Sequence, residues 1–188
     1  MIPTVGIVLS GGASRRMGTP KALLPDPTGT PFVVAQLRLL AAAGCSPLGV
    51  VAGLHAPRIR PLLPPDAALL ENPDWALGRM TSVQTAFRAY PAAPAFLLLP
   101  VDAPGIAPST VRALLDAASA APSTPWRPLY RGLPGYLLWI PASHVPRLLA
   151  LPPDARLDAA VAPLAQTLPL DDPALRRNLN TPADLADV

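Results

Sequence analysis

The stretch LSGGASRRMGTPK, residues 9–21, directly follows an apolar run at the start of the chain. The run 5–9 is typical of a buried strand, and it ends at the adjacent glycines Gly11 and Gly12. Ligands of open α/β sheets bind beyond the carboxyl ends of the strands, where glycines let backbone N–H groups approach a phosphate. Arg16 and Lys21, the last residue of the stretch, add cations that can pair with phosphate oxygens. The stretch therefore predicts a strand that opens into a loop suited to a triphosphate.

That last residue, Lys21, is the only lysine of the chain. The loop is not a Walker A motif, because Gly12 and Gly18 are six residues apart and Lys21 is followed by Ala22 rather than Ser or Thr. The glycine spacing also fails to match the G-x-G-x-x-G dinucleotide fingerprint. Local chemistry alone leaves two interpretations open: a phosphate-binding loop, or a glycine turn with solvated arginines.

The composition indicates one globular domain, residues 1–188, with a sizeable core. Apolar residues make up 51% of the chain, yet no stretch approaches the roughly 18 unbroken apolar residues of a membrane span. The first residues show no secretory signal pattern, so we expect a cytoplasmic protein without a membrane partner. The net charge is +3, but the arginines are scattered and aromatics are 5%, which argues against a nucleic-acid partner. A single cysteine, Cys45, excludes a disulfide within the chain.

Apolar runs and helical spacings alternate along the first two thirds of the chain. Such alternation predicts an α/β fold, a Rossmann-like three-layer α/β/α sandwich with a mostly parallel sheet. Two runs flanking RGLPG predict a small β excursion in the C-terminal half. Strands are expected at 5–9, 48–52, 67–70, 95–101, 126–130, 136–140 and 166–170. Helices are expected at 31–43, 56–63, 82–90, 109–121 (capped by Ser109), 143–150, 154–162 and after Thr181, where Asp184 completes the cap.

Asp102 closes the most apolar predicted strand, and Pro104 and Gly105 follow it. A carboxylate at the carboxyl end of a strand faces the ligand crevice. Mg²⁺ typically takes one or two carboxylates together with phosphate oxygens and waters. Asp102 is therefore the best candidate for a metal ligand, and the alternative is an aspartate that caps the next turn.

The opening stretch resembles the first signature of the MobA-like nucleotidyltransferase family, approximately L-A-G-G/A-x-S-x-R-M-G-x-x-K. Four further segments resemble family motifs in the same order, so the resemblance spans nearly the whole chain. The signature matches are Leu9, Gly11, Gly12, Ser14, Arg16, Met17, Gly18 and Lys21, and the further segments are ENPDWALGRMTS (71–82), LLPVDAPGI (98–106), RPLYRGLPGYLLW (127–139) and NLNTPADL (178–185).

The resemblance implies roles for residues in these segments. The implied catalytic residues are Arg16, Lys21 and Asp102, and the implied nucleotide contacts are Leu9, Ser10, Gly11, Gly12, Ser14, Lys21, Asn72 and Asp102. The implied acceptor contacts are Gly78, Ser82, Gly135 and Tyr136, and the implied ligands of Mg²⁺ are Asp102 and Asn180. As a metal ligand, Asn180 offers a carbonyl oxygen that carries no charge. For Asn72 there is an alternative role, which is to turn the chain before Pro73.

The implied activity is that of an enzyme, a Mg²⁺-dependent nucleotidyltransferase. It would move NMP from CTP or GTP to a phosphorylated acceptor such as molybdopterin, with release of pyrophosphate and with transient docking to a molybdoenzyme. Gly11 resembles the guanylyl branch, whereas the NPDW and RGLPG segments favour CTP slightly. Tyr136 and Leu137 stand where the cytidylyl branch has histidine and proline, which affects the acceptor. The alternatives are a sugar- or polyol-phosphate nucleotidyltransferase, and a catalytically silent nucleotide-binding partner or chaperone of a molybdoenzyme.

Overall fold

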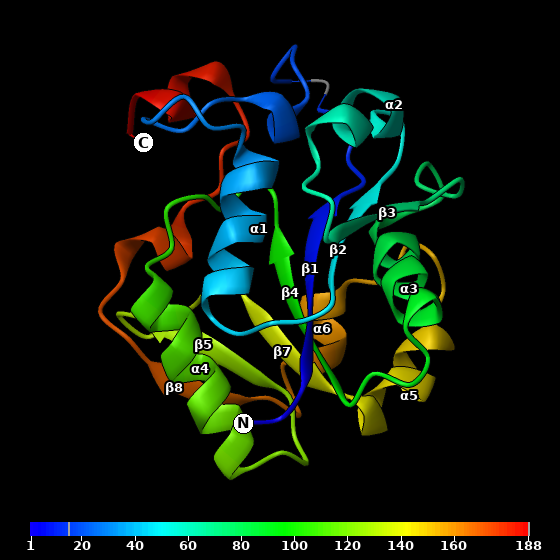
Figure 1. The fold of residues 1–188 in the computed structure, drawn as a ribbon. Helices are drawn as coiled ribbons and strands as arrows, with labels where there is room; N and C mark the ends of the chain where they lie inside the picture. The colour runs from blue at the N-terminus through cyan, green and yellow to red at the C-terminus, as the bar shows by residue number, and fades with distance from the viewer. Residues whose placement is uncertain (15, 188) are drawn as a thin grey trace.

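A single mixed sheet runs through the protein (Figure 1). The structure is a computed structural model, and it describes residues 1–14 and 16–187. The strand order is β3-β2-β1-β4-β7-β5-β6, and β8 pairs with β5. The strands are β1 (Thr4–Ser10), β2 (Leu48–Ala52), β3 (Ala67–Glu71), β4 (Ala95–Pro100), β5 (Trp126–Tyr130), β6 (Leu133–Pro134), β7 (Leu138–Pro141) and β8 (Gln166–Pro169).

The first four strands of the chain are parallel, and β1 lies between β2 and β4. Next to β4, strand β7 runs antiparallel, and β5 is antiparallel to β7. Strand β5 therefore points the same way as β4, and so does β8, which is parallel to β5. Strands β1, β4, β5 and β8 consequently end at the same edge of the sheet.

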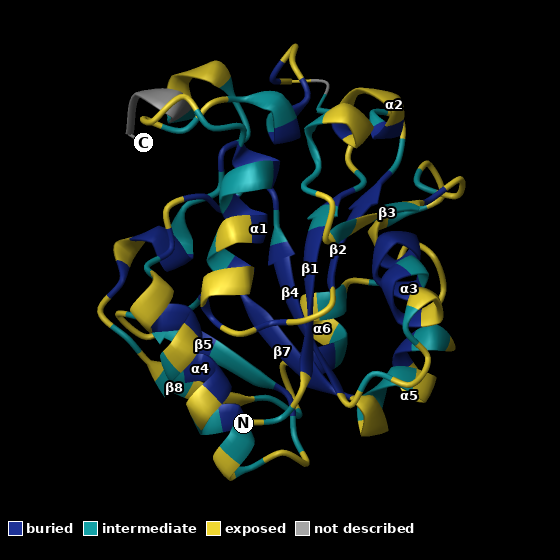
Figure 2. Ribbon diagram, viewed as in Figure 1, coloured by how far each residue is buried: buried dark blue, intermediate teal, exposed yellow. Residues whose placement is uncertain are grey.

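Helices cover both faces of the sheet, so the three-layer α/β/α prediction is confirmed (Figures 1 and 2). Alternate residues of the central strands face opposite ways: Val8 and Leu97 belong to one core, and Ile7 and Phe96 to the other. One core packs against α1 (Phe32–Ala42) and α4 (Pro108–Ala120). The other packs against α3 (Arg79–Ala89), α5 (Val145–Leu149) and α6 (Leu157–Val161).

The predicted C-terminal excursion is present and belongs to the main sheet. Strands β5 and β6 form a hairpin whose turn residues, Arg131 and Gly132, have φ angles of 49° and 75°. The sequence did not predict β6, and it placed the start of β7 two residues too early. Both segments are short and rich in proline, so their periodicity carries little information.

Several predicted helix boundaries were wrong. Helix α3 begins at Arg79 rather than Ser82. The region 56–63 is one α-turn, α2 (Ala56–Ile59), followed by a 3₁₀ turn at Arg60–Leu62, since prolines interrupt the helical hydrogen bonds. Helices α5 and α6 are shorter than predicted and begin at Val145 and Leu157, again after prolines or 3₁₀ turns. The C-terminal Pro182–Asp187 segment is a 3₁₀ helix.

Ser109 does not cap α4. The helix begins at Pro108, and no side chain of its own first turn caps it. Instead the Asp172 carboxylate accepts hydrogen bonds from the backbone N–H of Ala107 (2.9 Å) and the Thr110 hydroxyl (2.7 Å). The same carboxylate accepts a bond from the backbone N–H of Ala174 (3.0 Å). A buried acid from beyond β8 thus fixes the start of α4.

Within the described residues, no helix is both long and apolar enough to cross a membrane.

Replacing Asp172 with Ala should lower the free energy of unfolding by on the order of 3 kcal/mol, because three donors lose a buried acceptor. Urea unfolding followed by circular dichroism measures the change. Asp171→Ala is the matched control, because Asp171 is exposed and adjacent. Equal effects of the two substitutions would contradict the capping role.

Cys45 should be unreactive toward thiol reagents in the folded protein. It is 3% exposed, and burial raises the pKa of its thiol to about 12. The thiolate, which is the reacting species, is therefore scarce at a pH of about 8. We expect an aromatic disulfide reagent to react at least about 100-fold more slowly with the native chain than with the guanidinium-unfolded chain. Similar rates would show that the site opens readily.

Candidate nucleotide site

Two segments leave the sheet side by side at its carboxyl edge. In the parallel pairing of β1 with β4, Leu9 lies opposite Pro100. The backbone N–H of Val101 donates to the Leu9 carbonyl at 3.0 Å, so the pairing continues past the last residue of β4. The glycine loop after β1 and Asp102 after β4 consequently start from neighbouring positions.

Lys21 and Asp102 form an ion pair at this edge. The Lys21 Nζ lies 2.9 Å from Asp102 Oδ2, and the two side chains are 13% and 28% exposed. The lysine stands at the start of a 3₁₀ turn, Lys21–Leu23. The carboxyl-edge positions predicted for the loop and for Asp102 thus bring these two side chains together.

Asn180 is the third member of this cluster. Its Oδ1 accepts hydrogen bonds from Lys21 Nζ at 3.0 Å and from an Arg16 guanidinium nitrogen at 3.3 Å. The backbone N–H of Leu179 donates to the Asp102 carbonyl at 2.9 Å, which holds the C-terminal segment against the end of β4. Arg16, Lys21, Asp102 and Asn180, called the cation cluster below, thus come from three distant parts of the chain.

The turn after Asn180 is held by Asp184. Its carboxylate accepts hydrogen bonds from the backbone N–H groups of Asn180 (2.7 Å) and Thr181 (2.8 Å). These bonds hold the pKa of the Asp184 carboxyl below its usual value. The acid is therefore ionised at neutral pH. Of the cap predicted from Thr181 and Asp184, the bond from the Thr181 backbone to the Asp184 carboxylate is present.

The loop between β1 and Lys21 is closed by Ser14. This residue has a φ of 49°, its carbonyl accepts from the backbone N–H of Met17 (3.0 Å), and its hydroxyl accepts from the backbone N–H of Lys21 (3.2 Å). The Met17 side chain is buried, which ties the loop to the core. Ser14 therefore shapes the loop from within. Leu9 and Ser10 are still part of β1.

The two glycines of the loop have different surroundings. A Cβ on Gly11 would lie 2.2 Å from the Ser82 hydroxyl oxygen, whereas a Cβ on Gly12 would meet nothing within 4 Å. The first glycine thus packs against the start of α3, and the second faces open space. Of the two, Gly12 combines a bare backbone with room for a ligand.

The Asn72 side chain is buried and engaged within the protein. Its Nδ2 donates to the Thr81 hydroxyl (2.8 Å) and the Ser82 hydroxyl (3.1 Å), and its Oδ1 accepts from the backbone N–H of Asp74 (3.0 Å). These bonds match the alternative role of turning the chain before Pro73. Asn72 also seats Ser82 against the glycine loop.

The four residues expected at the acceptor fall into two groups. Gly78 and Ser82 lie at the start of α3, on the side of the sheet where β1 and β2 lie. Gly78 has no room for a side chain, because a Cβ there would lie 2.0 Å from the Pro153 carbonyl oxygen. Gly135 and Tyr136 directly precede β7, the strand next to β4. Because Leu138 of β7 pairs with Leu98 of the antiparallel β4, the two residues lie toward the same edge of the sheet as Asp102. The Tyr136 ring lies under the Arg176 guanidinium, 5.6 Å away.

Sequence reasoning did not predict the contacts of three residues that support this edge. The Gln36 amide nitrogen donates to the carbonyls of Pro100 (3.1 Å) and Val101 (3.2 Å), just before Asp102. A His55 ring nitrogen lies 3.2 Å from the Ala13 carbonyl oxygen, and Trp75 packs over Gly53. Only Gln36 left a signal, as a polar residue within the buried spacing of α1.

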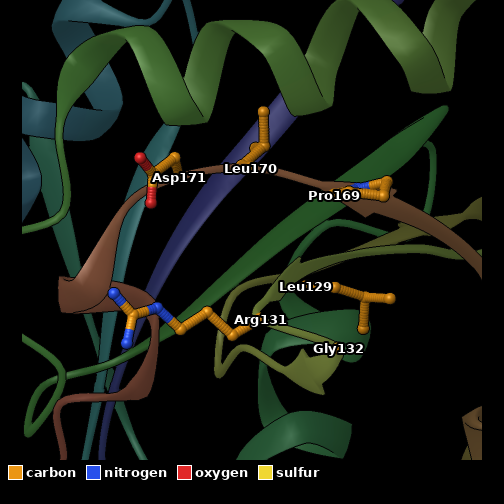
Figure 3. A pocket seen from close by; sticks show the side chains of 6 residues that line it. All are labelled: Leu129, Arg131, Gly132, Pro169, Leu170 and Asp171. Atoms are coloured by element: carbon orange, nitrogen blue, oxygen red, sulfur yellow. The ribbon is translucent and has the colours of Figure 1, made fainter.

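A separate hollow of about 300 Å³ lies at the ends of β5 and β8 (Figure 3). Figure 3 shows the Arg131 and Asp171 side chains on either side of it. It is lined by Leu129, Arg131, Gly132, Pro169, Leu170 and Asp171, and none of the predicted site residues lines it.

The fold is an α/β/α sandwich with the cation cluster at the carboxyl edge of its sheet. Residues 6–168 match the family model described as the MobA-like NTP transferase domain. The chain belongs to this family.

One curated relative is the "Probable molybdenum cofactor guanylyltransferase" of Rhodopirellula baltica, 34% identical over 124 residues, which are 64% of this chain. That match and the match to the protein of the same name from Mycobacterium tuberculosis (38% identical over 88 residues) cover 58% and 42% of those relatives, so the chain spans about half the length of these two. The protein of the same name from Mycobacterium ulcerans is 29% identical over 191 residues, which are 98% of this chain and 92% of that protein. Among solved structures, Rv0371c from Mycobacterium tuberculosis H37Rv has a TM-score of 0.82 and 25% identity, covering 98% of this chain and 97% of that chain. Its manganese complex has a TM-score of 0.70 and 22% identity, covering 90% and 89%.

The contact between Gly11 and Ser82 gives a stability prediction. Gly11→Ala should cost about 1–3 kcal/mol of unfolding free energy, because the new methyl displaces the Ser82 hydroxyl. Adding Ser82→Ala should recover part of that loss, whereas Gly12→Ala should leave stability nearly unchanged. Chemical unfolding of the variants and the double mutant measures the coupling. Strict additivity of the Gly11 and Ser82 effects would contradict the packing described.

Proposed function

We propose that the chain is a divalent-cation-dependent nucleotidyltransferase that moves NMP from an NTP to a phosphorylated acceptor and releases pyrophosphate. One observation carries the proposal: the cation cluster lies at the carboxyl edge shared by β1 and β4, and the loop that leads to it includes the open Gly12. Cations and bare backbone N–H groups together suit a triphosphate. Family membership supports the same class of reaction.

The residues of the cluster fit a divalent cation. Asp102 offers a carboxylate and Asn180 an amide oxygen, which are hard oxygen donors of the kind that Mg²⁺ and Mn²⁺ take. Both oxygens lie within 3.0 Å of one ammonium nitrogen, so they converge on a single cation-sized position. The solved manganese complex of Rv0371c, a protein of similar fold, supports this choice. When bound, the metal would neutralise charge on the nucleotide phosphates.

The chain's own residues would hold the triphosphate in line for attack. Arg16 and Lys21 pair with phosphate oxygens and stabilise charge that develops on the leaving pyrophosphate. Gly12 lets backbone N–H groups approach the phosphates. An acceptor phosphate oxygen then attacks the α-phosphorus, and the bond from that phosphorus to the oxygen bridging it to the β-phosphate breaks. A phosphate nucleophile is already ionised, so no general base is needed; positioning carries the reaction.

We propose molybdopterin as the acceptor and GTP as the nucleotide, because the curated relatives carry the name molybdenum cofactor guanylyltransferase. CTP is the second candidate. The segments that contain Asn72 and Gly135 resemble the cytidylyl branch, and they favoured CTP at the level of sequence. The cation cluster does not distinguish GTP from CTP, because its proposed contacts are with the phosphates that both nucleotides carry. An activity assay distinguishes them.

Pyrophosphate release should require both an NTP and molybdopterin. With GTP and CTP compared in parallel, Lys21→Ala and Asp102→Ala should each lower kcat/KM by at least about 100-fold, since each removes a charge used in the transition state. Arg156→Ala is the control, because Arg156 is exposed and pairs with Asp158, away from the cluster.

Wild-type rates in either cluster variant would contradict the catalytic roles of Lys21 and Asp102. Turnover with a sugar phosphate but not with molybdopterin would contradict the proposed acceptor and favour a sugar-phosphate nucleotidyltransferase. Tight NTP binding without turnover on either acceptor would favour a nucleotide-binding partner of a molybdoenzyme.

A further inference from the structure

The Lys21 ammonium occupies the position that suits a metal ion. It donates to Asp102 Oδ2 at 2.9 Å and to Asn180 Oδ1 at 3.0 Å, and these are the carboxylate and amide oxygens of the cluster. An ammonium has three donors, so one donor is left for a further acceptor. The Lys21 ammonium is thus a cation supplied by the chain itself between these two oxygens.

A divalent cation placed between Asp102 Oδ2 and Asn180 Oδ1 would compete with this ammonium for the two oxygens. Mg²⁺ binds oxygens at about 2.0–2.1 Å and would stand within a few ångströms of Nζ, where the repulsion between a double and a single charge is strong. The contact is only partly exposed, with side-chain exposures of 13% and 28%, so solvent screens that repulsion incompletely. The lysine in this position therefore opposes metal entry between the two oxygens.

The geometry allows the ammonium to move while its backbone stays fixed. The Ser14 hydroxyl accepts from the Lys21 backbone N–H, and Ala22 next to it is buried. The charged group is carried on a flexible four-carbon stem. Gly12, in the same loop, leaves open space in which a phosphate could offer new acceptors.

We infer that Lys21 makes metal binding conditional on the nucleotide. Without nucleotide, the lysine holds Asp102 and Asn180 and excludes the divalent cation. A triphosphate draws the ammonium onto its own oxygens and frees the oxygen pair for the metal. This inference rests on the proposed function for the identity of the ligands, and it assigns Lys21 a second role beyond charge neutralisation.

Binding of Mn²⁺ alone to the full chain tests the inference, with free Mn²⁺ counted by electron paramagnetic resonance and no nucleotide present. Lys21→Met should bind Mn²⁺ at least about tenfold more tightly than the wild type, because the competing charge is gone. Lys21→Arg should stay weak, since the cation is retained. Adding Asp102→Asn to Lys21→Met should abolish the gain, which assigns the ion to this site.

Arg156→Met controls for net charge, because it removes one positive charge from an exposed position away from the cluster. Thermal melts verify that each variant is folded, and Lys21→Gln replaces Lys21→Met if the latter does not fold. Equal Mn²⁺ affinity of the wild type and both neutral variants would overturn the inference, and so would an equal gain in Arg156→Met.

Pyrophosphate release by the wild type separates the metal competition from the proposed function. Normal turnover together with unchanged Mn²⁺ affinity of the Lys21 variants would reject the competition and leave the proposed function standing. Absence of both turnover and Mn²⁺ binding in every protein would reject the two together.

Discussion

The parallel pairing of β1 with β4 is the constraint on which the candidate site depends. Both strands are runs of mostly apolar, buried residues, and each continues to the edge where its glycines or its aspartate follow. The register then delivers the glycine loop and Asp102 to neighbouring points on one edge. Gln36 strengthens this arrangement from α1, since its amide binds the last carbonyls before Asp102. A rigid sheet thus supports a polar cluster whose charges are only partly screened.

The C-terminal segment completes the cation cluster by supplying Asn180, which lies after the last strand of the chain. Asp172 fixes the start of α4, Leu179 binds the end of β4, and Asp184 turns the chain behind Asn180. These three anchors place an amide oxygen beside two cations. Each anchor includes a hydrogen bond to a backbone group, and Asp172 adds one to the Thr110 hydroxyl.

The strands and the three-layer arrangement could be predicted because apolar runs, glycines and prolines report local structure directly. The proximity of Lys21 to Asp102 followed from the rule that parallel strands end at one edge. The cap of α4 could not be predicted, because its carboxylate comes from Asp172, far along the chain. The orientation of Asn180 toward two cations could not be predicted either, since tertiary packing decides the hydrogen-bond partners. For Asn72 the sequence offered the turn before Pro73 as an alternative, but it did not give the partners Thr81 and Ser82. Short proline-rich strands such as β6 carry too few residues for a periodic signal.

The most direct measurement of the central claim is the position of the metal in crystals grown with Mn²⁺ and either GTP or CTP. Anomalous scattering locates manganese without reference to any assumed ligand. We predict one strong peak within coordination distance of the Asp102 carboxylate and beside the nucleotide phosphates, with the Lys21 ammonium moved onto a phosphate oxygen. A manganese peak at another edge of the sheet, or a nucleotide bound away from Gly12 and Lys21, would contradict that claim.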